Sequence, residues 1–403
     1  MTTQISNLHD NIQFIYELAL ARLEFEALGV NFELTNHLRE FKLNPEKELR
    51  ETLKQRLAYF KSINGDFTDY HFIQKANQTR SVNQYLTHWF YPYKGKFHPQ
   101  MIRALLNILK VKRGEIILDP FVGSGTTAVE CQLLGINCIG LDISPLCTLI
   151  SKVKTESLEV IEEIKKEKEE AISSFVSNGN HPYQNGLFSK KQTEEAKSNP
   201  IQEKVFNFFQ LAEMIAHSDN HRRRRNFQTS FVMNVDKMIA SIEDYRKVTK
   251  KLGLKLGKVF IKEGDARKLK FNKKVQGIIT SPPYSIALNY VANDSHALEA
   301  MGYDLNKIKE DFVGVRGSGV NKFKLYNDDM ALAYKKMYDV LEKGRYCAIV
   351  IGNVTYQNEE VDTTSLVIKQ CENVGFKLER KIEKVIFGLY NIMQKEYILL
   401  FKK

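Results

Sequence analysis

Apolar residues follow two different spacings along the chain. Over residues 1–88 they recur at helical spacing, as at Ile15, Leu18 and Leu23, and a charged stretch follows them. Beyond this region, short apolar runs alternate with helical patterns. The sequence therefore predicts an accessory helical region over residues 1–88 and a strand-containing domain after it.

Two of the short apolar runs lie close together, at residues 115–119 and 137–142. A glycine-containing loop and a helical pattern that extends to Leu134 separate them, so this segment predicts a strand–helix–strand unit. Such a unit favours a parallel sheet with helices on both faces. We therefore expect residues 89–155 to form the first half of an α/β core.

Strand-like runs return in the last part of the chain, with helical patterns between them. They lie at residues 258–265, 276–284, 345–353, 376–387 and 396–403. The last two runs are joined by a short segment with turn residues, which predicts an antiparallel pair at a sheet edge. We expect residues 258–403 to form the second half of the core.

Between the two halves, over residues 156–257, strand signals fade and charged residues recur as on a solvated helix. The pattern predicts a helical insertion. It contains a run of four arginines beside an aromatic residue: Arg222, Arg223, Arg224, Arg225 and Phe227. Such a run is suited to contacts with phosphates, although an ordinary solvated surface run has the same composition.

Composition adds two constraints. The 403 residues carry 59 Lys and Arg against 48 Asp and Glu, a formal charge of +11 that suits a polyanionic partner but also occurs in basic proteins without one. The five cysteines are odd in number and include no CxxC pair, so the sequence indicates neither a disulfide framework nor a metal site. It shows no secretory leader and no apolar run near the roughly 20 residues of a membrane span, so we expect a cytosolic protein.

The glycine loop after residue 119 is the strongest chemical signal. It reads Asp-Pro-Phe-Val-Gly-Ser-Gly-Thr-Thr and lies between a strand and a helix. Gly123 and Gly125 allow a tight turn and the close approach of a ligand, and Asp119 offers a carboxylate to a positive group. Ala128 breaks the spacing of the dinucleotide motif, and no Gly-Lys-Ser/Thr follows, which excludes a P-loop.

Two further signals lie at the ends of other strands. Asp142 follows the loop by about 20 residues, at the place where acidic residues in α/β nucleotide sites reach ribose hydroxyls, although it is equally placed to cap the next helix. Asp119 and Asp142 together imply an adenosine-type ligand that carries a cation. The sequence Ser281-Pro282-Pro283-Tyr284 also follows a strand, and its two prolines make the loop rigid.

These motifs resemble those of the N4-cytosine and N6-adenine amino-methyltransferases of DNA. The resemblance covers about residues 89–151 and 259–403 and implies a Rossmann-like, class I S-adenosylmethionine-dependent fold with a mostly parallel sheet. Phe97-His98-Pro99 resembles the family motif over the methionine end of the cofactor, and Asp265 stands where the family has an acid near the adenine amino group. The implied cofactor-binding residues are Phe97, His98, Pro99, Asp119, Pro120, Phe121, Gly123, Ser124, Gly125, Thr126, Asp142 and Asp265.

The resemblance also implies a mechanism. The side chain and carbonyl of Ser281 and the carbonyl of Pro282 would accept the amino hydrogens of a flipped-out base, Tyr284 would stack on that base, and Pro283 would hold the loop. Serine before Pro-Pro is typical of the N4-cytosine enzymes, so N4 of cytosine is the leading target. N6 of adenine, an RNA amino group such as guanine N2 of transfer RNA, and a noncatalytic DNA-binding protein are the alternatives. A restriction–modification or phage-defence setting, with a cognate restriction endonuclease as partner, is implied by the resemblance alone.

One feature departs from the family pattern. The large insertion falls before Gly264-Asp265 rather than between that point and the catalytic motif. Its assignment as the target-recognition region is therefore a hypothesis, based on its size and on the arginine run.

Overall fold

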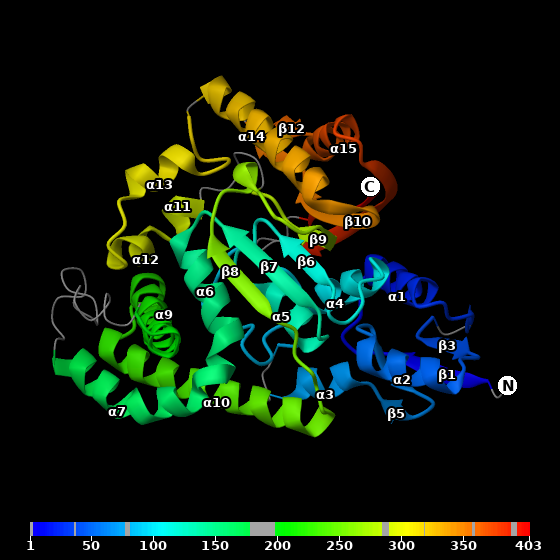
Figure 1. Ribbon diagram of the computed structural model, residues 1–403, viewed down its shortest axis with the longest axis horizontal. Coiled ribbons are helices and arrows are strands. Elements are labelled where there is room, and N and C mark those ends of the chain that lie inside the picture. Colours follow the sequence, from blue (N-terminus) through cyan, green and yellow to red (C-terminus); the bar gives the residue numbers. More distant parts are fainter. Residues whose placement is uncertain are drawn as a thin grey trace.

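The computed structural model describes residues 3–35, 38–76, 81–177, 198–283, 290–317, 319–356, 359–387 and 393–403. Figure 1 shows a central sheet flanked by helices, with the N-terminal region at one side and the helices of the insertion at the other.

The central sheet has seven strands among the described residues, in the order β13-β14-β10-β9-β6-β7-β8. The strands are β6 (Ile116–Asp119), β7 (Asn137–Asp142), β8 (Val259–Glu263), β9 (Val275–Thr280), β10 (Leu341–Gly352), β13 (Lys377–Phe387) and β14 (Met393–Lys402). All neighbours pair in parallel except β14, which runs antiparallel to both β10 and β13. The predicted mostly parallel sheet and antiparallel edge pair are confirmed.

The chain changes direction across the sheet between β6 and β9. From β6 it continues to β7 and β8 on one side, whereas β9 and β10 lie on the other side. Strands β6 and β9 are direct parallel neighbours, with Leu118 opposite Ile278. In open α/β sheets ligands bind outside the carboxyl ends of the strands at such a switch point. The fold therefore places the ends of β6 and β9, with Asp119 and Thr280, at the expected binding crevice.

Alternating side chains of the strands pack into cores on the two faces of the sheet. Ile117 and Ala348 belong to a core with α4 (Pro99–Ile108) and α5 (Thr126–Leu133). Their neighbours Leu118 and Ile349 belong to a core with α14 (Gly319–Val340) and α15 (Thr363–Asn373). This alternation is what a strand buried on both faces produces. Helix α6 (Pro145–Glu156) follows β7 and contacts β8 and α5.

The N-terminal region is less helical than expected. It contains α1 (Ile15–Ala27), α2 (Lys47–Arg56) and α3 (Asp69–Lys75). It also contains an antiparallel sheet in the order β2-β3-β1-β4-β5, which the helical interpretation missed. Its strands are β1 (Gln4–Leu8), β2 (Phe32–Leu34), β3 (Glu40–Leu43), β4 (Phe60–Ile63) and β5 (Asp66–Phe67). Helix α1 packs against α4, which joins this region to the core.

The insertion is helical, as predicted. It contains η1 (Ser157–Val160), α7 (Ile161–Ser177), α9 (Pro200–Arg223) and α10 (Phe227–Leu252), which share an apolar core around Phe175, Phe208 and Phe231. The remaining elements are η2 (Ala266–Lys268), α11 (Tyr290–Asn293), α12 (Ser295–Ala300), α13 (Leu305–Asp311), β11 (Val354–Tyr356) and β12 (Glu359–Val361). Within the described ranges, none of the helices combines the length and apolarity that crossing a bilayer requires.

Candidate active site

A pocket opens where β6, β7 and β9 end. It brings together ten of the residues predicted from the sequence: Phe97, Pro120, Phe121, Gly123, Ser124, Thr126, Asp142, Asp265, Ser281 and Pro283. Asp119, Gly125, His98, Pro99 and Pro282 do not line its wall, and Tyr284 lies outside the described residues. The pocket also has walls that the sequence did not indicate, from Tyr93 and Lys96 and from Phe312 and Val313.

The glycine loop has a backbone that other residues rarely adopt. The φ angles of Gly123 and Gly125 are +50° and +76°, in the left-handed region that favours glycine. A Cβ atom on Gly125 would also lie 3.0 Å from the Cα atom of Ser151 in α6. Both glycines are therefore required by the local geometry, the first by its conformation and the second also by the close approach of α6.

Two side chains of α6 hold this loop by its carbonyls. The hydroxyl of Ser151 donates to the Gly123 carbonyl at 2.9 Å, and the ammonium of Lys154 donates to the Ser124 carbonyl at 2.7 Å. Lys154 is buried, and burial holds the pKa of its ammonium well below the usual range. Because the carbonyls of the loop are engaged from behind, its conformation is set before any ligand arrives.

Asp119 is buried at the end of β6. One carboxylate oxygen, Oδ1, accepts hydrogen bonds from the Thr280 hydroxyl at 2.7 Å and from the Phe121 N–H at 3.2 Å. The other, Oδ2, forms no such hydrogen bond within the described residues, although the nearby Thr127 side chain also favours the ionised form of the carboxyl. Burial raises the pKa of Asp119 to about 6. A buried carboxylate oxygen without a partner is costly, and it fits a cationic group supplied by a ligand.

Asp142 anchors the glycine loop to the end of β7. Its Oδ2 accepts from the Gly123 N–H and its Oδ1 from the Ser144 N–H, both at 2.9 Å. Ser144 is the N-cap of α6, so Asp142 also supports the start of that helix. Burial raises the pKa of Asp142 to about 6. Asp142 thus supports the start of α6 and also lines the pocket, while its contact with a ribose stays a prediction.

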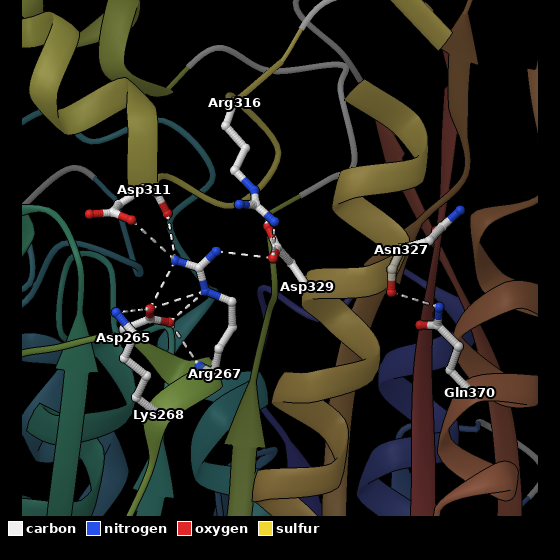
Figure 2. A network of polar contacts seen from close by, with 8 residues as sticks. All are labelled: Asp265, Arg267, Lys268, Asp311, Arg316, Asn327, Asp329 and Gln370. Carbon is white, nitrogen blue, oxygen red and sulfur yellow. Dashed lines mark hydrogen bonds and ion pairs between the residues drawn. The ribbon is translucent and has the colours of Figure 1, made fainter. Parts of the chain in front are cut away.

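Asp265 lines the pocket but is bound by an arginine. The guanidinium of Arg267 donates to both of its carboxylate oxygens, with Nε–Oδ1 at 2.8 Å and Nη2–Oδ2 at 2.8 Å (Figure 2). Burial opposes ionisation, but the hydrogen bonds from Arg267 hold the pKa of Asp265 below its usual range. Asp265 is therefore a carboxylate fixed by Arg267, and its carbonyl also accepts a hydrogen bond from the Lys268 N–H at 2.9 Å.

Arg267 continues this contact into a network that the sequence did not indicate. It donates to the buried carboxylate of Asp329 in α14 at 3.0 Å and to the Asp311 carbonyl at 2.9 Å. Arg316 donates to the same Asp329 at 2.6 and 2.8 Å (Figure 2). The partners stand up to 62 positions apart in the chain. The network ties the pocket wall at Asp265 to α14 and to the segment before it.

Helix α14 also holds the loop that follows β9. The hydroxyl of Tyr326 donates to the Pro283 carbonyl at 2.9 Å, and Tyr326 is buried. Because Pro283 has no N–H of its own, its carbonyl is the backbone group by which this loop is fixed. Tyr326 is thus a positioning residue for the Ser281–Pro283 segment.

Removing the Tyr326 hydroxyl tests this role. For Tyr326→Phe we expect the turnover rate to fall roughly three- to tenfold, the worth of one neutral hydrogen bond, with cofactor affinity unchanged. Tyr334→Phe is the matched control, because the Tyr334 hydroxyl lies buried on the same helix without a hydrogen-bond partner among the described residues. Equal losses in the two variants, measured by steady-state kinetics, would argue against positioning by Tyr326.

The segment before α4 supplies a further part of the pocket wall. Phe97 lines the pocket, whereas His98 is the N-cap of α4 and Pro99 its first residue. Burial lowers the pKa of His98 to about 4, so this ring is neutral near pH 7. Lys96 was missed by the sequence analysis. Its ammonium donates to the carbonyls of Asn83 and His88, and burial lowers its pKa to about 8.

The four arginines do not act as one patch. Arg222 donates to the Pro92 carbonyl at 2.9 Å and to the Asp294 carboxylate at 3.2 Å, so it holds the end of α9 against neighbouring segments. Arg223 and Arg225 both pair with Asp219 and stay about half exposed, at 56% and 47% of their side chains. Arg224 occupies the left-handed position between α9 and α10, with φ at +55°.

Within the described ranges, no group of three or more His, Cys, Asp or Glu side chains is arranged to hold a metal ion. All five cysteines are buried and unbridged.

The chain matches the family model described as RMKL-like, methyltransferase domain, over residues 90–309. It is 36% identical over 134 residues to the Type II methyltransferase M.MjaII of Methanocaldococcus jannaschii, which covers 33% of this chain and 23% of that protein. It is 31% identical over 114 residues to the probable tRNA (guanine(10)-N2)-dimethyltransferase of Methanothermococcus thermolithotrophicus, which covers 27% of this chain and 69% of that protein.

Among solved structures, the rRNA methyltransferase AviRa of Streptomyces viridochromogenes aligns with 81% of this chain and 95% of its own, at a TM-score of 0.37 and 11% identity. The chain spans less than a quarter of the length of M.MjaII and of two further Type II methyltransferases that it matches.

Proposed function

Since the chain belongs to the family of RMKL-like methyltransferase domains, we propose that it transfers a methyl group from S-adenosylmethionine to an exocyclic amino nitrogen of a DNA base, with N4 of cytosine as the leading target. The observation that carries the proposal is the meeting of the glycine loop, Asp142 and Ser281 in one pocket at the switch point of the sheet. The first two suit the methyl donor, and Ser281 begins the loop that suits the acceptor.

The residues of the pocket fit the methyl donor. Gly123 and Gly125 permit a close backbone approach, and the buried Oδ2 of Asp119 lacks a partner that a cationic group would supply. S-adenosylmethionine supplies an electrophilic methyl group on a sulfonium, so no metal and no protein nucleophile is needed for the transfer. Asp119 and Thr280, with the loop fixed by Ser151 and Lys154, hold the donor side of the site.

The acceptor side is formed by the loop after β9. An exocyclic amino group conjugated with its ring is a poor nucleophile, and hydrogen-bond acceptors for its two hydrogens favour the form that carries a lone pair. The side chain and carbonyl of Ser281 and the carbonyl of Pro282 are the candidate acceptors. Tyr326 fixes the Ser281–Pro283 segment through the Pro283 carbonyl, so the acceptors keep one geometry. A base in a duplex must leave the helix to reach them.

The choice of DNA rests on the motif and on the relatives. Serine before Pro-Pro resembles the N4-cytosine enzymes, and several curated relatives are named Type II methyltransferases. N6 of adenine in DNA is the nearest alternative. The second candidate substrate is guanine N2 of transfer RNA, which the similarity to the Methanothermococcus thermolithotrophicus protein favours. We also propose that the protein has a restriction endonuclease as partner and that it is located in the cytosol.

Transfer of label from S-adenosylmethionine to DNA and to transfer RNA, measured in parallel with the same enzyme preparation, tests the proposal. We expect label in DNA and only background in transfer RNA. Label in transfer RNA alone would replace the leading substrate by the second candidate. Cofactor binding without label in either nucleic acid would support the noncatalytic alternative.

The arginines of the insertion provide a separate prediction. Arg225→Ala removes an exposed cation, so we expect weaker DNA binding and a salt dependence that is lower by about one unit in slope. Arg222→Ala breaks the contacts to the Pro92 carbonyl and Asp294, so we expect it to lower the free energy of unfolding by about 1–3 kcal/mol instead.

Fluorescence anisotropy over a salt series and thermal unfolding of both variants separate these effects. Unchanged affinity and slope in Arg225→Ala would remove this arginine from the DNA interface.

A further inference from the structure

A second pocket adjoins the candidate active site. It lies between the segment of residues 84–96 and helices α9 and α10, and it shares two wall residues, Tyr93 and Lys96, with the first pocket. Its volume is about 940 Å³, at the upper end of the range for ligand pockets. The methyl-transfer reaction as proposed above assigns no role to this space.

The lining of the second pocket combines aromatic rings with cations. Trp89, Tyr91 and Tyr93 come from the segment before α4, and Arg223, Arg225 and Lys237 come from α9, α10 and the turn between them. The indole N–H of Trp89 donates to the Ser241 hydroxyl at 2.8 Å, which fixes the orientation of the ring. The ring is neither fully buried nor fully exposed, so part of it is open to a ligand.

The charge of the second pocket is positive on balance. Two carboxylates line it against four cations: Asp219 is shared by Arg223 and Arg225, and Asp244 pairs with Lys247 at 3.2 Å. Lys237 lines the pocket and is exposed. Lys96, on the wall between the two pockets, donates only to carbonyl oxygens. A ligand that combines negative charge with flat rings is complementary to the cations and the aromatic rings of this surface.

We propose that the second pocket binds an unpaired nucleotide of the substrate strand, next to the nucleotide that is methylated. The inference rests on the proposed function. Aromatic side chains bind single-stranded nucleic acid by stacking on its bases, and cations beside them bind its phosphates. Tyr93 and Lys96 line both pockets, so the two pockets are close enough together for neighbouring nucleotides of one strand. A base inside a duplex is stacked on both faces and offers none to Trp89, so the enzyme prefers substrates that are unpaired over at least two nucleotides.

Trp89 makes this proposal measurable, because it is the only tryptophan of the chain. Its fluorescence is recorded while a short single-stranded oligodeoxynucleotide is added, and anisotropy of a labelled copy gives the affinity in parallel. We expect quenching that follows the binding curve, and a smaller response to the duplex of the same sequence. A titration with S-adenosylmethionine alone controls for effects transmitted through Tyr93 and Lys96.

Two variants extend the test. Trp89→Leu keeps an apolar side chain but loses the stacking surface, so we expect about tenfold weaker binding of the single strand. Lys237→Ala leaves the aromatic wall unchanged, and we expect weaker binding with a salt slope lower by about one unit. If Trp89→Leu fails to fold, the Lys237→Ala variant and the fluorescence of the native protein still test whether the second pocket binds a nucleotide.

The outcomes separate this inference from the proposed function. Binding and methylation of DNA with unchanged Trp89 fluorescence and an unaffected Lys237→Ala variant would overturn the second pocket and leave the proposed function in place. Quenching by single-stranded RNA but not by DNA would keep the pocket and change the substrate. Absence of any binding or methylation of nucleic acid would overturn the proposed function and the second pocket with it.

Discussion

Replacing Asp119 by asparagine is expected to lower the affinity for S-adenosylmethionine by roughly 10- to 100-fold while the fold is retained. Asparagine keeps the Oδ1 acceptor that the Thr280 hydroxyl and the Phe121 N–H use. The substitution removes the negative charge of the carboxylate, whose Oδ2 has no hydrogen bond within the described residues. Isothermal titration calorimetry measures the loss directly, without relying on turnover.

The same carboxylate predicts a pH dependence. Burial raises the pKa of Asp119 to about 6, above its unfolded value near 3.8, so ionisation destabilises the protein without ligand as the pH rises through about 6. A cationic ligand binds the ionised form. We therefore expect the affinity for S-adenosylmethionine to increase as the pH rises through about 6 and then to level off.

In Asp119→Asn this increase is expected to be smaller, because the amide does not titrate. Glu33→Gln is the charge-matched control, since Glu33 is exposed in β2 of the N-terminal region. If the native protein and Asp119→Asn show the same affinity and the same pH profile, Asp119 does not meet the cationic part of the cofactor.

Replacing Ser281 by alanine is expected to lower kcat by about 100-fold with little change in cofactor affinity. The hydroxyl is one of the proposed acceptors for the amino hydrogens, and it acts only when the base is in place. Alanine keeps the backbone carbonyl, so some activity remains. Single-turnover kinetics with saturating cofactor measures the methyl-transfer step separately from cofactor binding.

The comparison with cofactor binding makes this prediction specific. Ser281→Ala and Asp119→Asn are expected to have opposite signatures, the first in turnover and the second in affinity for S-adenosylmethionine. A Ser281→Ala enzyme that loses cofactor affinity as strongly as Asp119→Asn would mean that Ser281 serves the donor side.

Much of the core could be predicted because its signals are local. The strand before Asp119, the glycine loop and the strand before Asp142 follow one another within about 25 residues, and the geometry of a strand–helix–strand unit fixes their relation. The left-handed glycines and the pocket at the switch point follow from that relation. Ser281 lies about 160 residues away, yet it is placed by the general rule that parallel strands end at one edge of the sheet.

The features that could not be predicted depend on contacts between distant residues. The network of Arg267, Asp329 and Arg316 joins segments that no spacing rule connects, and the separate role of Arg222 depends on where Asp294 lies. The N-terminal sheet was missed because its strands have only two to five residues, too few for an alternating pattern to stand out. From the sequence alone, an arginine that holds the fold could not be distinguished from one that stays exposed.

The identity of the methylated nucleoside tests the central claim most directly. DNA is incubated with the protein and isotopically labelled S-adenosylmethionine, digested to nucleosides and analysed by mass spectrometry, with Ser281→Ala as the control. We expect labelled N4-methylcytosine, in an amount that is much lower with Ser281→Ala. Labelled N6-methyladenine would retain the mechanism and correct the base, whereas DNA without any labelled nucleoside would contradict the account.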